Sequence, residues 1–187
     1  MRKSYFLIML FFILELYSCS KNTNNNNNIT PPPPPPVHIP LVVYTAGYIY
    51  DGVTNIATYW KNDTPVLLEP RLGGVNNSFA YSITVSGNDI YVAGYNRDGA
   101  VYWKNGIPVK LTAGVLASSI VVSGNNVYAA GYQSDGSINT ATYWKNGNPV
   151  RLTDSSLTSE ANAITVSGND VYVAGTIGSA AGIHCGP

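Results

Sequence analysis

Apolar and polar residues alternate over short segments that recur along the chain. Ile83-Thr84-Val85 shows the alternation of branched apolar side chains that is typical of a half-buried β-strand. A Gly-Asn pair follows each such strand and favours a tight hairpin into a second strand. The copies read ITVSGNDIYVAGY at 83–95, IVVSGNNVYAAGY at 120–132 and ITVSGNDVYVAGT at 164–176.

A second recurring segment predicts a third and a fourth strand. Its copies read ATYWKNDTPVLL at 57–68, AVYWKNGIPVKL at 100–111 and ATYWKNGNPVRL at 141–152. Asn105-Gly106 and Asn146-Gly147 are strong signals for a hairpin, whereas Asn62-Asp63 in the first copy is a weaker one. The fourth strand is predicted to begin at Pro65, Pro108 or Pro149, and a proline there places it at the outer edge of a sheet.

The spacing of the repeats predicts the architecture. Trp60, Trp103 and Trp144 are separated by 43 and 41 residues, a period that is typical of β-propeller blades. No segment of 41–187 has helical periodicity, and counting the repeats gives thirteen strands, or about three four-stranded antiparallel blades. Because closed propellers have about four to eight blades, we expect an all-β, partial β-propeller. The tail TIGSAAGIHCGP at 176–187 does not continue the repeat, so we expect a fragment, or else a tail that closes the structure differently.

The connections between strands differ in how much their lengths vary. The two hairpin turns keep their length in each copy. From the glycine of the second strand to the tryptophan of the third, the chain spans thirteen, nine and thirteen residues. From the last leucine of the fourth strand to the isoleucine of the next first strand, it spans fifteen, nine and twelve. In an up-and-down sheet both variable connections lie at one end, which predicts a binding face there.

The first forty residues differ in composition from the rest. Residues 1–18 have a basic start and an apolar run at 5–14 that is too short to cross a bilayer, which predicts a signal peptide. Leu16-Tyr17-Ser18-Cys19 resembles a bacterial lipobox, which implies lipidation of Cys19; the alternative is an ordinary secreted protein. Residues 19–40 then form an asparagine- and proline-rich linker, which we expect to be disordered. These segments predict a lipid-anchored protein of the bacterial cell envelope, on an outer-membrane, periplasmic or surface-facing side.

The composition of the predicted repeat domain, 41–187, excludes several classes of function. It has seven Lys or Arg and nine Asp or Glu, and this near-neutral charge gives no indication of binding to nucleic acid or to an anionic membrane surface. The only histidines, His38 and His184, lie in the linker and the tail, which leaves no member for a catalytic triad or a metal centre. Cys185 has no partner for a disulfide if Cys19 is lipidated. We therefore predict no enzyme activity, no cofactor and no metal.

Two sets of recurring residues admit both a structural and a functional interpretation. Asp51, Asp98 and Asp135 recur in Tyr-x-x-Asp-Gly loops, where carboxylates suit calcium or sugar hydroxyls, but Asp-Gly is also ordinary turn chemistry. Recurrence in every copy favours the turn. An aromatic ring at the same strand position in each copy likewise favours packing of sheet against sheet over ligand stacking, so we expect the tryptophans to be structural.

Residues that begin the variable loops, or that differ from one loop to the next, are better candidates for ligand binding. Three tyrosines begin the variable loops, Arg97 is a cation without counterpart in the other copies, and the longest connection has its own polar residues. With two of the loop aspartates, the candidate ligand-binding residues are Tyr48, Arg71, Asn76, Asn77, Tyr95, Arg97, Asp98, Tyr132 and Asp135.

The phrases VYVAGY, DG and ATYWKNG together resemble the repeats of bacterial extracellular β-propeller proteins of kelch-like type, over residues 41–176. The sequence departs from kelch repeats by having Ala-Gly in place of paired glycines, and it lacks the Trp-Asp of WD40 repeats. The resemblance implies binding of proteins or glycans, although some propellers are enzymes. We therefore expect an envelope-anchored, non-catalytic module that binds a glycan or protein. The alternatives are an enzyme such as a glycosidase with its active residues in missing blades, and a structural spacer.

Overall fold

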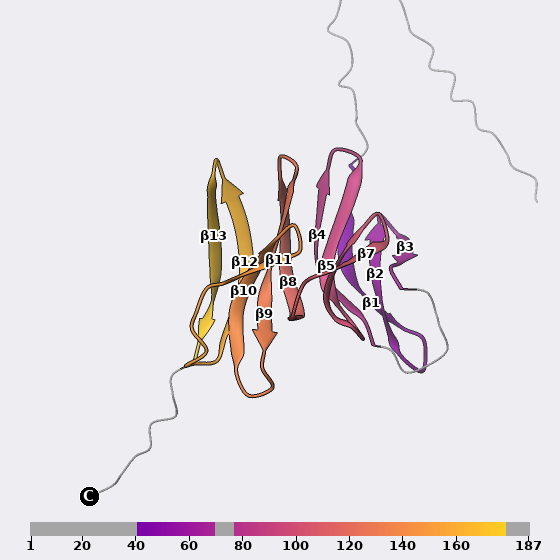
Figure 1. The fold of residues 1–187 in the computed structure, drawn as a ribbon. Helices are drawn as coiled ribbons and strands as arrows, with labels where there is room; N and C mark the ends of the chain where they lie inside the picture. Colours follow the sequence, from indigo (N-terminus) through magenta and orange to yellow (C-terminus); the bar gives the residue numbers. More distant parts are fainter. Residues whose placement is uncertain (1–40, 70–76, 179–187) are drawn as a thin grey trace, which may run out of the picture. The chain divides into compact units, whose positions relative to one another are not determined.

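The computed structural model describes residues 41–69 and 77–178 (Figure 1). Within these residues the chain forms thirteen β-strands and no helix, which confirms the all-β prediction and the predicted strand number. This part of the chain accordingly has no helix that could cross a membrane. The predictions for the signal peptide, Cys19, the linker and the C-terminal tail fall outside the described residues.

The strands pair with their neighbours in the chain to form four open antiparallel sheets, which we name A to D. Sheet A contains β1 (Tyr44–Tyr50), β2 (Asn55–Lys61) and β3 (Thr64–Leu67). Sheet B contains β4 (Phe79–Ser86), β5 (Asp89–Asn96), β6 (Gly99–Lys104) and β7 (Ile107–Lys110). Sheet C contains β8 (Gly114–Ser123), β9 (Asn126–Ser134), β10 (Asn139–Lys145) and β11 (Asn148–Arg151). Sheet D contains β12 (Ser159–Ser167) and β13 (Asp170–Ile177).

Asparagine in each Lys-Asn turn has a double role. Asn105 and Gly106 have φ angles of 51° and 81°, the positive pair that a type I′ hairpin requires. The Asn105 backbone N–H donates to the Ile90 carbonyl, and its side-chain oxygen accepts from the Ile90 N–H, both at 2.9 Å. Asn146 forms the same two bonds with Val127. The asparagine therefore ties the hairpin of the third and fourth strands to the start of the second strand.

The prediction that the fourth strand begins at its proline is wrong by one residue. β3 begins at Thr64, which lies opposite Lys61 beside the two-residue turn, and Pro65 lies opposite Trp60. In an antiparallel ladder the pair next to such a turn is hydrogen-bonded and the following pair is not. The position of Pro65 therefore needs no N–H towards its partner, and a strand can start before it. The predicted location at a sheet edge is confirmed for β3, β7 and β11.

A β-bulge in the first strand of each repeat explains the Ala-Gly pair in the second. In β4 the bulge lies between Ala80 and Ser82, and it brings the Phe79 carbonyl against Gly94. A Cβ atom on Gly94 would lie 1.9 Å from the Phe79 oxygen. A Cβ atom on Gly131 would lie 1.9 Å from the Leu116 oxygen, and one on Gly175 would lie 2.1 Å from the Glu160 oxygen. Only glycine fits a position where another backbone approaches this closely.

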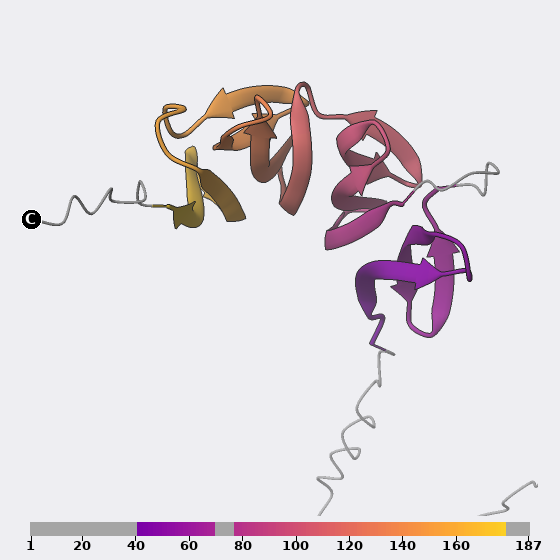
Figure 2. The same ribbon diagram turned by 90° about the horizontal axis from the view of Figure 1, so that it is seen from below.

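Consecutive sheets follow one another face to face (Figure 2). The Tyr-Trp pair of the third strand packs between them. Trp103 packs into an apolar cluster with residues of sheet A, whereas its neighbour Tyr102 packs towards sheet C. Trp103 and Trp144 are fully buried, which confirms their predicted structural role. Trp60 is only half-buried, because no sheet precedes sheet A in the described part of the chain. The alternation of two aromatic residues thus joins sheets B and C each to both of their neighbours.

Candidate functional site

Four aromatic side chains from β1, β4 and β5 form a cluster that we call the aromatic patch: Tyr48, Phe79, Tyr81 and Tyr95. Phe79 lies directly opposite Tyr95 in the ladder, and their rings stack with centroids 5.2 Å apart. The Tyr81 ring is almost parallel to that of Phe79, at 6.4 Å, and stacks with Tyr95 at 6.2 Å. Tyr48 of sheet A meets the Phe79 ring edge-on at 4.8 Å. The patch therefore spans the junction of sheets A and B.

The bulge of β4 positions Tyr81. Ala80 pairs with Gly94 and Ser82 pairs with Ala93, so Tyr81 is the extra residue that the ladder leaves unpaired. A bulge re-aims the side chain of its extra residue, and bulges are common beside functional sites. Tyr81 is 49% exposed and Tyr48 is 52% exposed. The patch thus combines mutual ring contacts with about half of its two outer rings open to solvent.

The phenol groups of this region interact electrostatically across sheets. Burial raises the pKa of Tyr81, and Tyr95, Tyr132 and Tyr48 raise it further. Burial also raises the pKa of Tyr132, with smaller contributions from Glu160 and Tyr95. Tyr132 on β9 is therefore a near neighbour of the patch, although no ring contact joins it to the other tyrosines. These two phenols remain protonated at neutral pH and can both donate and accept hydrogen bonds.

The structure brings the three tyrosines that were predicted from the loops to one region of the surface. Tyr48 and Tyr95 belong to the aromatic patch, and Tyr132 lies beside it. Sequence reasoning missed Phe79 and Tyr81, which lie at the start of the first strand and not in a loop. The available signal was the position of Tyr81 in the repeat, where the other copies have Ser118 and Asn162.

Three other polar candidates, Asn77, Arg97 and Asp98, lie within the described residues and have partners there. Arg97 and Asp98 are exposed in the turn between β5 and β6, where the Arg97 Nε and Asp98 Oδ1 atoms lie 3.9 Å apart. The Asn77 side-chain oxygen accepts from the Asn55 N–H at 2.9 Å, which fixes the start of β2. Arg71 and Asn76 lie outside the described residues. These observations show how the side chains are held and leave their ligand-binding role as a prediction.

The loop aspartates of sheets A and C serve as turn residues. Asp135 accepts from the Ser137 and Ile138 N–H groups at 2.9 Å, and Asp51 accepts from Val53 and Thr54 in the same way. The bonds from Ile138 and Ser137 lower the pKa of Asp135. The turn interpretation is thus confirmed for both. Asp98 differs, because in its shorter loop the Asn96 side chain accepts from the Asp98 N–H.

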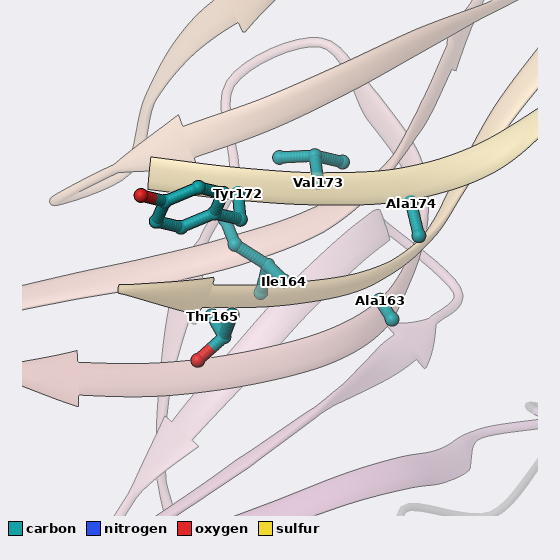
Figure 3. Close-up of a pocket in the computed structure, with 6 residues that line it drawn as sticks. All are labelled: Ala163, Ile164, Thr165, Tyr172, Val173 and Ala174. Carbon is teal, nitrogen blue, oxygen red and sulfur yellow. The ribbon is translucent and has the colours of Figure 1, made fainter. Parts of the chain in front are cut away.

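A shallow hollow of about 220 Å³ lies on sheet D, and Figure 3 shows the residues that line it. They are three cross-strand pairs of β12 and β13: Ala163 with Ala174, Ile164 with Val173, and Thr165 with Tyr172. This lining is mainly apolar and contains no carboxylate, histidine or cysteine. Among residues 41–69 and 77–178, no group of three or more His, Cys, Asp or Glu is arranged to hold a metal ion. The aromatic patch is therefore the better candidate site.

The chain was compared with known protein families, curated proteins and solved structures. No family model, curated protein or solved structure matches the chain. The kelch-like resemblance thus depends on the repeat residues alone. Any functional conclusion has to come from the geometry of the described sheets.

Proposed function

We propose that this protein is a non-catalytic binding module of β-propeller type, anchored to the bacterial envelope through Cys19, and that its aromatic patch binds a glycan. The single observation that supports this best is the contiguous set of ring contacts joining Tyr48, Phe79, Tyr81 and Tyr95, with Tyr48 and Tyr81 half-exposed. Aromatic rings that are partly open to solvent offer an apolar surface beside phenol hydroxyls. Sugars present the matching combination of apolar ring faces and hydroxyl groups.

The Tyr81 ring is not required by the packing of one sheet on another. Its ring contacts are with Phe79 and Tyr95, which both belong to its own sheet. At the bulge, the same backbone is built with Ser118 in β8 and with Asn162 in β12 in place of Tyr81. Since the fold accepts a small polar residue there, it does not explain an exposed tyrosine. An exposed aromatic cluster that includes such a residue is typical of a binding site.

The propeller and the anchor are supported by separate observations. Four consecutive sheets with their strands in chain order, three of them with the fourth strand of the repeat at the edge, have the connectivity expected of propeller blades. The anchor is supported by the lipobox-like Leu16-Tyr17-Ser18-Cys19. Cys19→Ala should move the protein from the membrane fraction to the soluble fraction. Retention of this variant in the membrane fraction would exclude lipidation of Cys19 as the anchor.

The binding proposal is tested with a polysaccharide pull-down and a glycan array. Tyr81→Ala should lose binding, whereas Tyr172→Ala should retain it, because Tyr172 is similarly exposed, at 54%, but lies on sheet D. Equal binding by the two variants would contradict the site. Release of sugar products would support the enzyme alternative, and the absence of saturable binding would support a spacer. A Tyr81-dependent protein partner without glycan binding would support recognition of a protein.

A further inference from the structure

We infer that the ligand of this site is a neutral sugar chain that lies across the first strands of sheets B, C and D, with its stacking subsite at Tyr81 and its polar subsites at Ser118 and Asn162. This inference rests on the proposed glycan binding and goes further, since it gives the ligand a charge, a minimum length and a direction.

The extra residue of each bulge occupies the same place in its sheet. Tyr81 lies between Ala80 and Ser82 in β4, Ser118 lies at the matching position of β8, and Asn162 lies at that of β12. Tyr81 and Asn162 are exposed and Ser118 is partly exposed. The bulges therefore present three side chains from equivalent backbone positions in three consecutive sheets.

The strands that carry these residues are neighbours. The Ser82 hydroxyl of β4 accepts from the Ile120 N–H of β8 at 3.2 Å. One sheet further on, the Ser119 hydroxyl of β8 accepts from the Ile164 N–H of β12 at 3.3 Å. Each of these residues is next to, or two residues from, a bulge residue in the chain. The three bulge side chains thus form a row that crosses adjacent strands, and a ligand that contacts all of them has to be extended.

The chemistry changes along this row. Sheet B contributes Tyr81 and the other rings of the patch, which suit the apolar face of a sugar ring. Sheet C contributes the hydroxyl of Ser118, and sheet D contributes the amide of Asn162, each able to donate to and accept from sugar hydroxyls. A chain whose units all have one apolar face and a hydroxyl rim satisfies both ends of the row. A peptide without a regular repeat of these two properties matches it less well.

The charges beside the row favour a neutral ligand. Glu160 lies two residues before Asn162, accepts from the Asn139 side chain at 3.0 Å and acts electrostatically on Tyr132. A carboxylate at the sheet D end repels anionic sugars. Arg97 is paired with Asp98, and the Arg151 Nε–H donates to the Gln133 side chain at 3.1 Å. These two cations are therefore engaged outside the row.

Calorimetry with defined oligosaccharides tests this inference. The neutral probes are the disaccharides and hexasaccharides of the cello-, xylo- and manno- series, and the anionic probe is hexagalacturonate. We expect a neutral hexasaccharide to bind more tightly than its disaccharide. Tyr81→Ala should weaken both by about tenfold or more, because the aromatic stacking surface of the site is lost. Asn162→Ala and Ser118→Ala should each weaken only the hexasaccharide, by about fivefold, the equivalent of one hydrogen bond.

Controls separate this inference from the proposed function. Thr165→Ala, an exposed change on β12 away from the bulge, should leave both affinities unchanged. Glu160→Gln should raise the affinity for hexagalacturonate. Equal affinities for short and long neutral probes, no effect of Asn162→Ala, or tighter binding of hexagalacturonate by the unaltered protein would overturn the inference. Glycan binding that is lost in Tyr81→Ala would still support the proposed function in those cases, whereas no binding of any sugar would overturn both.

Discussion

Gly94→Ala adds one methyl group at the point where the backbones of β4 and β5 approach most closely. The Cβ atom would lie 1.9 Å from the Phe79 carbonyl oxygen and 3.1 Å from the Ala80 Cα. An ordinary contact between carbon and a carbonyl oxygen is about 3.3 Å or longer, so β4 has to move by about 1.4 Å. Both obstacles are backbone atoms, and no side-chain rotation can relieve the overlap.

The cost of that movement can be worked from the ladder. β4 pairs with β5 through Ala80 and Gly94 on one side of the bulge and through Ser82 and Ala93 on the other. Disturbing the backbone hydrogen bonds around these pairs costs about 1 kcal/mol for each bond. Overpacking by one methyl group adds about 1–3 kcal/mol. We therefore expect Gly94→Ala to lower the free energy of unfolding by about 3 kcal/mol or more.

Gly47→Ala provides a matched control at the same position of sheet A. Among residues 41–69 and 77–178 no strand lies beyond β1 in that sheet, and the added Cβ meets only the Trp60 ring, at 3.1 Å. A side chain can give way, and alanine also restricts the unfolded chain by about 0.4–1 kcal/mol, so the net change should stay within about 1 kcal/mol. Urea unfolding followed by tryptophan fluorescence measures both variants. Equal midpoints for the two alanine variants would refute the role of the bulge.

The other predictions concern packing, the turns and pH. Trp103→Ala should cost about 3–5 kcal/mol, since this ring is fully buried, and Trp60→Ala should cost clearly less; thermal unfolding compares them. Asn105→Ala should cost about 2 kcal/mol, about 1 for the positive φ and about 1 for the lost bond to the β5 backbone, measured by urea unfolding. The Lys104 ammonium, 2.8 Å away, holds the pKa of Asp89 below its usual 3.8. A lowered pKa stabilises the folded state above pH 3.8, and this contribution is lost as the pH falls through the folded-state pKa. Lys104→Met should therefore be less stable than the parent at pH 7, and this difference should shrink in acid; a difference that does not change with pH would contradict the pairing.

The sheets could be predicted because local rules and tertiary packing agree in each repeat. Ile83-Thr84-Val85 alternates as a half-buried strand should, and Asn105-Gly106 selects the hairpin that the structure contains. Trp103 has the same place in its strand as Trp144, which is what a ring packed between repeated sheets requires. Where strand propensity, turn residues and core packing all favour the same structure, that structure can be predicted from a single sequence.

The aromatic patch could not be predicted in the same way, since it depends on two features that a repeat pattern does not reveal. The bulge of β4 produces no recognisable pattern of apolar and polar residues in the sequence. Its clearest sequence signal is Gly94, which lies in the opposite strand. The contact of Tyr48 with Phe79 joins two sheets, and its geometry depends on how sheet A faces sheet B. The prediction that Tyr48, Tyr95 and Tyr132 begin the variable loops is wrong in detail, because they lie within β1, β5 and β9 near the ends of these strands. Loop length also gave no reason to include Phe79 and Tyr81.

The bulge also explains how a repetitive fold can present a different side chain at the same backbone position of each sheet. Its backbone is fixed in every complete copy by the glycine opposite, so any change at Gly94 disturbs the ladder. The extra residue is under no such restraint, because it pairs with nothing in the ladder, and it is tyrosine, serine or asparagine in the three sheets. A position that is rigid in its backbone and free in its side chain is well suited to hold a ligand-binding group in place. Replacing Ser118 with tyrosine should therefore be tolerated by the fold and should extend the stacking surface towards sheet C, which would make Ser118→Tyr a gain-of-binding variant for a long neutral sugar chain.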